Sequence, residues 1–64
     1  MTIKELKKGD YFTFKQIDEP KDRQVWVRDE YDRSSKKFLV YCFGDFNKQR
    51  LVNGDKVVFI DFTF

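Results

Sequence analysis

The chain has 64 residues, a net charge of +2 and many aromatic residues: eight Phe, three Tyr and one Trp. This length corresponds to one small domain, residues 1–64, which needs a dense core to be stable. The absence of histidine removes the commonest catalytic base and metal ligand, the single cysteine excludes an internal disulfide, and no apolar run approaches the length of a membrane span.

The composition also favours β structure and a reducing compartment. The chain contains no alanine and only three leucines, whereas Val, Phe and Tyr are frequent. We therefore expect a mainly β protein in which helix is limited to single turns. A secreted domain of this size would usually carry disulfides, and no signal peptide is visible, so we expect a cytoplasmic protein in which Cys42 is a reduced, buried thiol.

One sequence frame occurs twice, beginning at Thr2 and again at Asn47. Each copy has a helix-capping residue, a leucine four positions later, then Gly-Asp and an alternation of apolar residues that ends on Phe. Thr2 and Glu5 have the spacing of a capping box, and Asn47 is a favourable N-cap. The frame therefore predicts two short helical turns, each leading into a strand.

Three pairs of residues within the frame have predicted roles: Gly9 and Gly54, Leu6 and Leu51, and Asp10 and Asp55. The glycines would end the helical turns with positive φ, a conformation that strains other residues. The leucines would face inward. The aspartates would accept hydrogen bonds from nearby backbone amides, so turn chemistry accounts for them without a catalytic role.

Four or five strands are predicted from period-two alternation and from turn residues. A charged loop around Pro20 follows the first strand, and residues 32–35 form a hairpin turn between the second and third strands. Phe12 and Phe14 would face inward from the first strand, and Val25 and Val27 from the second. The third strand is apolar on both faces, so alternation does not decide which face is buried. The predicted strands cover residues 11–17, 24–31, 37–43 and 56–60, with residues 61–64 as a fifth strand or a bent continuation.

Short strands joined by helical turns suggest a small, strongly bent antiparallel barrel. The chain resembles the SH3-like small β-barrels, including those of translation and transcription proteins, in Leu6-Lys7-Lys8-Gly9-Asp10 and Leu51-Val52-Asn53-Gly54-Asp55. It is also similar over most of its length to short bacterial and phage proteins of no known activity, through residues 8–12, 30–37 and 54–59. These resemblances imply a fold and carry over no binding residue. An open sheet with a helical turn on one face and an OB-like barrel are the alternatives.

The sequence favours binding over catalysis. Without histidine, a nucleophile and its base would have to be built from lysine or carboxylate side chains. The chain also has no CxxC pair, no Gly-rich phosphate loop and no calcium-loop spacing. We therefore expect a non-enzymatic domain without a cofactor or a metal site.

An aromatic and basic constellation is the best candidate for a binding site. Trp26 and Arg28 would share the solvent face of the second strand, with Tyr41 near them on the third strand. Aromatic rings on a sheet, with cations around them, suit single-stranded nucleic acid because rings stack on bases and cations hold phosphates. Residues 33–50 carry five basic side chains and one acidic side chain, whereas residues 16–32 carry three basic and six acidic ones. The predicted nucleic-acid-binding residues are Trp26, Arg28, Arg33, Lys36, Lys37, Tyr41, Lys48 and Arg50.

Two other interpretations remain open. Trp26 can instead cover one end of a small core, and the acidic residues within 29–32 would repel phosphates. The second alternative is a protein-interaction module, a monomer or a weak homodimer, that uses the third strand and the tail from Phe62 to Phe64. Salt dependence separates these alternatives, because phosphate binding weakens steeply with salt and apolar docking does not.

Overall fold

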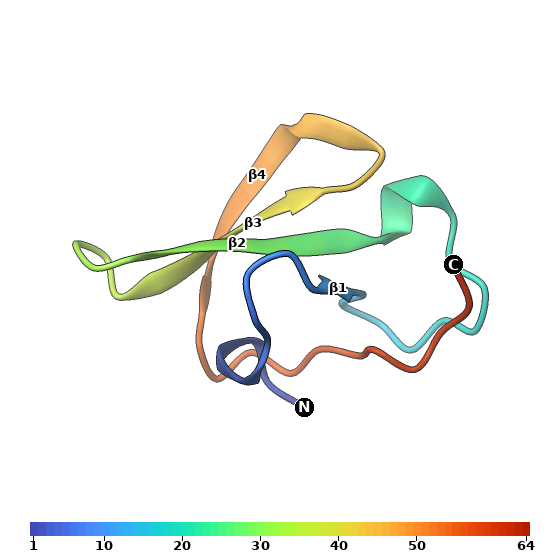
Figure 1. The fold of residues 1–64 in the computed structure, drawn as a ribbon, viewed down its shortest axis with the longest axis horizontal. Coiled ribbons are helices and arrows are strands. Elements are labelled where there is room, and N and C mark those ends of the chain that lie inside the picture. The colour runs from blue at the N-terminus through green and yellow to red at the C-terminus, as the bar shows by residue number, and fades with distance from the viewer.

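A computed structural model describes residues 1–64 as one four-stranded antiparallel sheet (Figure 1). The strands are β1 (Tyr11–Phe12), β2 (Trp26–Asp32), β3 (Lys37–Cys42) and β4 (Asp45–Asn53), in the order β1-β2-β3-β4. Two 3₁₀ turns, η1 (Ile3–Glu5) and η2 (Asp22–Gln24), are the only helical segments, so the prediction of a mainly β protein is confirmed. β1 and β4 do not pair, so the sheet is open and the predicted closure into a barrel is not confirmed.

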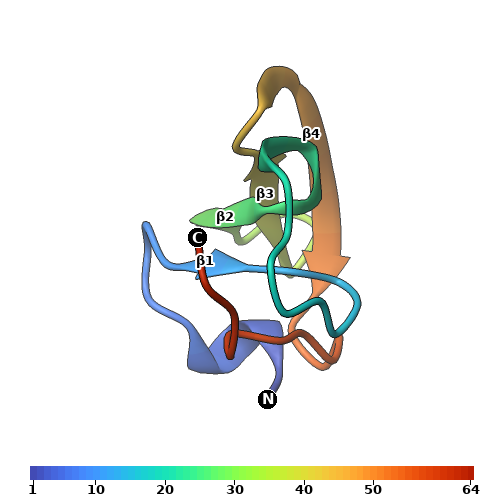
Figure 2. The ribbon, with the colours of Figure 1, turned by 90° about the vertical axis from the view of Figure 1, so that its right-hand side faces the viewer.

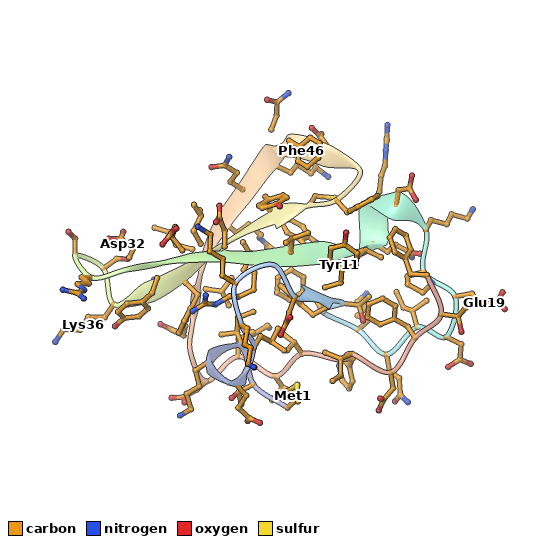
Figure 3. The ribbon with its side chains drawn as sticks, viewed as in Figure 1. Met1, Tyr11, Glu19, Asp32, Lys36 and Phe46 are labelled. Carbon is orange, nitrogen blue, oxygen red and sulfur yellow. The ribbon has the colours of Figure 1, made fainter.

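β2 and β3 form the predicted hairpin. The carboxylate of Asp32 accepts hydrogen bonds from the Ser34 amide and the Ser35 hydroxyl, both at 3.0 Å, as short polar side chains often do in turns. Lys36 completes the turn with a φ of 58°. The hairpin extends away from the rest of the molecule, and Asp32 and Lys36 lie at its far end (Figures 1 and 3).

The first copy of the repeated frame forms as predicted. The amide and the hydroxyl of Thr2 donate hydrogen bonds to Glu5 Oε1 at 3.2 and 2.9 Å, and η1 begins there. Leu6 is buried and Gly9 has a φ of 94°. The Asp10 carboxylate accepts a hydrogen bond from the amide of residue 7 at 2.8 Å as the chain turns toward β1.

The second copy does not form a helical turn, so this prediction is wrong. Residues 47–52 lie within β4, where residues 49–52 pair with β3, and Leu51 is 46% exposed instead of inward-facing. Gly54 lacks the predicted positive φ, which among the glycines only Gly9 adopts. Residues 48–51 are Lys, Gln, Arg and Leu, which are all good helix formers, so strand pairing with β3 prevails here over both helix propensity and the capping signal.

The C-terminal segment contributes two isolated bridges in place of the predicted strand over residues 56–60. These bridges join Thr2 to Val57 and Thr13 to Phe59. The inward side chain is that of Val58, whereas Val57 is 55% exposed. The segment runs below the sheet beside η1, as the two views show (Figures 1 and 2). The first strand is also shorter than predicted, because regular pairing ends at Phe12.

The hydrophobic core lies between one face of the sheet and the two terminal segments. Its buried members are Ile3, Leu6, Phe12, Val40 and Val58, and partly buried Phe14, Trp26, Phe38 and Val52 pack around them. We call this side of the sheet the core face.

No helix in the chain is long and apolar enough to cross a membrane.

The register of β2 corrects the predicted orientation of its side chains. Trp26 pairs with Phe12 and Cys42, and Arg28 pairs with Val40. Directly opposed residues of an antiparallel pair point to the same face, so Trp26 and Arg28 point to the core face and not to solvent as predicted. Cys42 is fully buried and free, as expected.

Val25 and Val27 are buried as predicted, but on the other side of the sheet. Val27 pairs with Tyr11 on one side and Tyr41 on the other. These tyrosines flank the small valine side chain and shield it from water, so both faces of the sheet are apolar near its centre.

Candidate functional site

Two half-buried aromatic rings meet at one end of the core face. Phe14 and Trp26 lie 5.2 Å apart between ring centroids, with an angle of 68° between their planes. Phe14 also packs edge-on against buried Phe12 at 5.2 Å. Trp26 is held in place by pairing between β1 and β3. We call Phe14 and Trp26 the aromatic corner, since their planes meet at an angle and do not form one flat platform.

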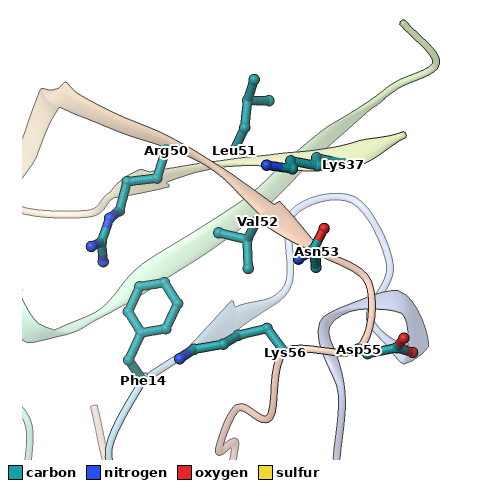
Figure 4. Close-up of a pocket in the computed structure, with 8 residues that line it drawn as sticks. All are labelled: Phe14, Lys37, Arg50, Leu51, Val52, Asn53, Asp55 and Lys56. Carbon is teal, nitrogen blue, oxygen red and sulfur yellow. The ribbon is translucent and has the colours of Figure 1, made fainter. Parts of the chain in front are cut away.

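Two cations lie over the aromatic corner. The guanidinium carbon of Arg50 is 5.3 Å from the centroid of Phe14 and 5.6 Å from that of Trp26. Arg50 comes from β4 and pairs with buried Val40, which directs its side chain to the core face. Lys56 Nζ lies 6.0 Å from the Phe14 ring, from the segment that follows β4. Figure 4 shows both cationic groups pointing toward Phe14.

Three open grooves meet at this place. The largest, of about 530 Å³, runs along β4, and two others, of about 440 and 240 Å³, lie beside Trp26. Three residues, Phe14, Trp26 and Arg50, each line two of the grooves. Open grooves that share the same rings and the same cation form one continuous surface around the aromatic corner.

The grooves are strongly basic. They contain one carboxylate, Asp55, and the five cationic side chains of Lys15, Lys37, Lys48, Arg50 and Lys56. Asp55 accepts a hydrogen bond from Lys4 Nζ at 2.8 Å, and this bond and the positive charge hold the pKa of Asp55 below its usual value. The other ion pair in the chain, Lys8 with Glu30, involves none of the groove residues. The five groove cations therefore have no carboxylate partner, and their charge is available to an anion.

The structure brings together some of the predicted site residues. Trp26, Lys48 and Arg50 line one groove, although Lys48 and Arg50 come from β4 and not from the predicted helical turn. Lys37 lines the far end of the largest groove. Four of the eight predicted residues thus lie on the surface around the aromatic corner.

The other four lie elsewhere. Arg28 packs its guanidinium over Phe38, 4.7 Å from the ring centroid, and its Nε is buried without a hydrogen-bond partner. Tyr41 points to the face opposite Trp26, because it pairs with Val27, so the predicted proximity of the two rings is wrong. Arg33 and Lys36 belong to the hairpin turn and line none of the grooves.

Three aromatic or cationic residues of the surface were missed: Phe14, Lys15 and Lys56. Phe14 was predicted only as an inward residue of the first strand, two positions after Phe12. The same spacing places both rings on one face, but the proximity of Phe14 to Trp26 depends on which residues pair across the sheet. Lys15 and Lys56 carry no sequence signal beyond their charge.

The opposite face of the sheet carries a second group of aromatic rings. The row of Tyr11, Val27, Tyr41 and Gln49 crosses all four strands in register. Tyr11, Phe43 and Phe64 form a cluster with centroid separations of 5.0 to 5.9 Å, and Tyr41 packs against Phe46. Phe46 is 66% exposed and Phe64 is 50% exposed, so this second surface is apolar and open to solvent.

Nowhere in the chain do three Asp, Glu or Cys side chains converge as a metal ion would need. Comparison of the chain with models of known protein families, with curated proteins and with solved structures found no match. The candidate site is therefore defined by the geometry of this chain alone.

Proposed function

We propose that this domain is a non-enzymatic binding module that binds single-stranded nucleic acid at the aromatic corner. The observation that carries the proposal is the placement of Arg50 over both rings of the corner, within grooves lined by four further cations. Bases stack on aromatic rings whatever their sequence, and cations alongside hold the backbone phosphates.

The shape of the corner favours an unpaired base over a duplex. The two rings are half-buried and inclined to each other, so a ligand must present the face of a single base to reach them. Bases in a duplex are stacked on their neighbours and expose only their edges, whereas a single strand can turn a base outward. The partner therefore has the chemistry of a single strand, in a loop or at an end.

The distribution of charge also supports this partner. The acidic residues within 29–32, which argue against phosphate binding on the sequence alone, belong to the hairpin end of β2 and line none of the grooves. Asp55, the one carboxylate in the grooves, is neutralised by Lys4. A phosphate near Arg50 would thus be attracted by cations without an opposing free carboxylate.

Equilibrium binding of a fluorescently labelled, short single-stranded oligonucleotide tests the proposal. Three phosphate contacts would give a slope of log affinity against log salt near −2, so affinity should fall by roughly tenfold or more between about 50 and about 200 mM salt. Trp26→Ala should weaken binding by about 1–3 kcal/mol, the usual value of one stacked base. Absence of binding at the lower salt concentration would refute the proposal.

Matched variants separate the site from general attraction to a basic protein. Lys48→Ala and Lys56→Ala remove exposed groove cations and should each reduce the salt slope by somewhat less than one. Lys36→Ala removes the same charge at the hairpin tip and should leave the slope nearly unchanged. Tyr41→Ala removes an aromatic ring from the opposite face and should not affect affinity. Equal losses in all four variants would contradict a localised site.

A second candidate function is homodimerisation through the opposite face. The observation that favours it is the row of Tyr11, Val27, Tyr41 and Gln49, which carries no charge and continues into the exposed rings of Phe46 and Phe64. Two copies could meet through this face without burying a charge. Native mass that rises with protein concentration, persists in high salt and falls on Tyr41→Ala would favour this function.

We also infer that the fold is a reduced relative of the SH3-like small barrels. The C-terminal segment continues from β4 and reaches Thr13 beyond β1 through the bridge to Phe59, which is the path a closing fifth strand would take. A cytoplasmic location and a bacterial or phage origin belong to the same proposal, and the buried free thiol of Cys42 suits a reducing compartment.

A further inference from the structure

Arg50 occupies the space that a stacked base would use. Its guanidinium lies over Phe14 and Trp26 at 5.3 and 5.6 Å, within the range of cation–π attraction, and a base would stack over the same ring faces. A base and this guanidinium cannot cover the same ring at once. In the free protein, Arg50 therefore acts as a cover over the aromatic corner, and Figure 4 shows its guanidinium pointing toward Phe14.

Little holds this cover in place. The Arg50 side chain is exposed, makes no ion pair and donates no hydrogen bond. Attraction between an exposed guanidinium and an aromatic ring is weak, so the side chain can leave the rings easily. Its backbone stays fixed by pairing with Val40, so the displaced guanidinium remains near the corner.

Once displaced from the rings, the positively charged guanidinium is free to bind an anion. The groove shared by Trp26 and Arg50 is otherwise lined by Asn47, Lys48 and Gln49, and it contains no carboxylate. A phosphate attached to the entering base is the natural partner, because guanidinium and phosphate form paired, charge-assisted hydrogen bonds. A base without a phosphate would displace Arg50 from the rings and provide no anion to bind the displaced guanidinium.

The corner has room for one base. The planes of Phe14 and Trp26 are inclined by 68°, so a base that stacks on one ring meets the other ring at its edge. Two successive stacked bases would need two roughly parallel rings. The minimal ligand is therefore one base with its phosphate.

We infer that Arg50 is a specificity-determining residue: it covers the aromatic corner in the free protein and moves onto a phosphate when one base enters, so that the site selects a nucleotide over a bare nucleoside. This inference rests on the proposed function and adds to it the size of the ligand and the basis of its selection.

Fluorescence of Trp26, the single tryptophan, measures the prediction directly. Adenosine, adenosine monophosphate and inorganic phosphate are titrated separately into the wild type and into two variants, Arg50→Ala and Lys48→Ala. The wild type should bind the monophosphate more tightly than adenosine. Arg50→Ala should bind adenosine more tightly than the wild type, by about two- to fivefold for an exposed cation–π contact removed, and should bind the monophosphate more weakly.

Lys48→Ala is the matched control, because Lys48 lines the same groove without lying over a ring. This variant should bind the monophosphate more weakly than the wild type does and should bind adenosine with unchanged affinity. Denaturation midpoints of the three proteins, together with the chemical shift of the Trp26 indole proton, check that the corner remains folded.

Two results would overturn the inference. If Arg50→Ala lowers the affinity for adenosine or leaves that affinity unchanged, Arg50 does not cover the aromatic corner in the free protein. If neither adenosine nor the monophosphate binds any of the proteins while an oligonucleotide does, the corner is not a site for one nucleotide, although the proposed function survives. Failure of the oligonucleotide to bind the wild type would instead remove the proposed function itself.

Discussion

Gly9 connects η1 to β1 through a backbone conformation that few residues adopt. Its φ is 94°, and a Cβ placed there would meet no other atom within 4 Å. A substitution at this position therefore changes stability through backbone strain and not through a steric clash.

Gly9→Val should lower the free energy of unfolding by on the order of 1 kcal/mol or more, measured by chemical denaturation. Gly9→Asn is the control, because asparagine tolerates positive φ better than a β-branched residue, and its effect should be smaller. An unchanged midpoint for the valine variant would mean that the turn readily takes another conformation.

Three exposed carboxylates should make stability decline in acid. Hydrogen bonds from Thr2 lower the pKa of Glu5, and hydrogen bonds and charge from Lys8 and Lys4 lower the pKa values of Glu30 and Asp55. A carboxyl group whose pKa is lower in the folded state contributes stability above its ordinary pKa, near 4.5 for Glu. That contribution is lost as the pH falls through the lowered value.

Denaturation midpoints between about pH 3 and about pH 7 test this prediction. Glu30→Gln should make the acid decline shallower. Glu19→Gln, at a loop residue without a hydrogen bond or an ion pair, should leave the decline unchanged. Because all these groups are exposed, the effects are small, and added salt should reduce them.

The orientation of Trp26 shows which features of the sheet can be predicted from the sequence and which cannot. Alternation correctly separates Trp26 and Arg28 from Val25 and Val27, since neighbours along a strand point to opposite faces. It does not say which face meets the core, because here both faces are buried near the middle of the sheet. The register with Phe12 and Cys42 decides this, and register is a long-range property.

At the scale of elements, the C-terminal segment provides a direct test of the described packing. Val58 is 1% exposed and belongs to the core, whereas its neighbour Val57 is 55% exposed and only its backbone takes part in a bridge.

Val58→Ala should destabilise the protein by about 2 kcal/mol, from about 0.8 kcal/mol for each buried methylene together with the cavity left behind. Val57→Ala should change stability by no more than about 0.5 kcal/mol, as surface substitutions usually do. Thermal or chemical denaturation of both variants gives the comparison. Equal losses would contradict the described orientation of the segment.

The two copies of the repeated frame have different structures because their surroundings differ. The first copy has a complete capping box, and Thr2 and Glu5 form it without help from distant residues. The second begins at Asn47, which has no Glu three positions later, and β3 pairs with this segment from Gln49 onward. Local signals predicted the turn at η1 and the hairpin at Asp32, whereas β4 depends on pairing that local signals do not encode.

At the scale of the whole molecule, β4 is a long open edge of the sheet, and its charges limit self-association. If two copies of β4 paired antiparallel about Gln49, Lys48 of each copy would lie opposite Arg50 of the other. Like charges directly opposed across strands are destabilising, and cations on edge strands commonly prevent such pairing.

Lys48→Glu should therefore introduce concentration-dependent dimerisation that weakens in high salt, because a carboxylate would then face Arg50. Lys36→Glu makes the same charge change at the hairpin turn and should remain monomeric. Sedimentation analysis measures both. A wild-type dimer that is insensitive to Lys48→Glu and to salt would instead indicate association through the opposite face.

The most direct test of the central claim is a titration of the backbone amide chemical shifts with a short single-stranded oligonucleotide at low salt. The account predicts that shifts concentrate at Phe14, Lys15, Trp26, residues 47–50 and Lys56, while Tyr11, Tyr41 and Phe64 on the opposite face remain unmoved, and that the shifts disappear as salt is added. Shifts confined to the opposite face, or no shifts at any salt concentration, would contradict it.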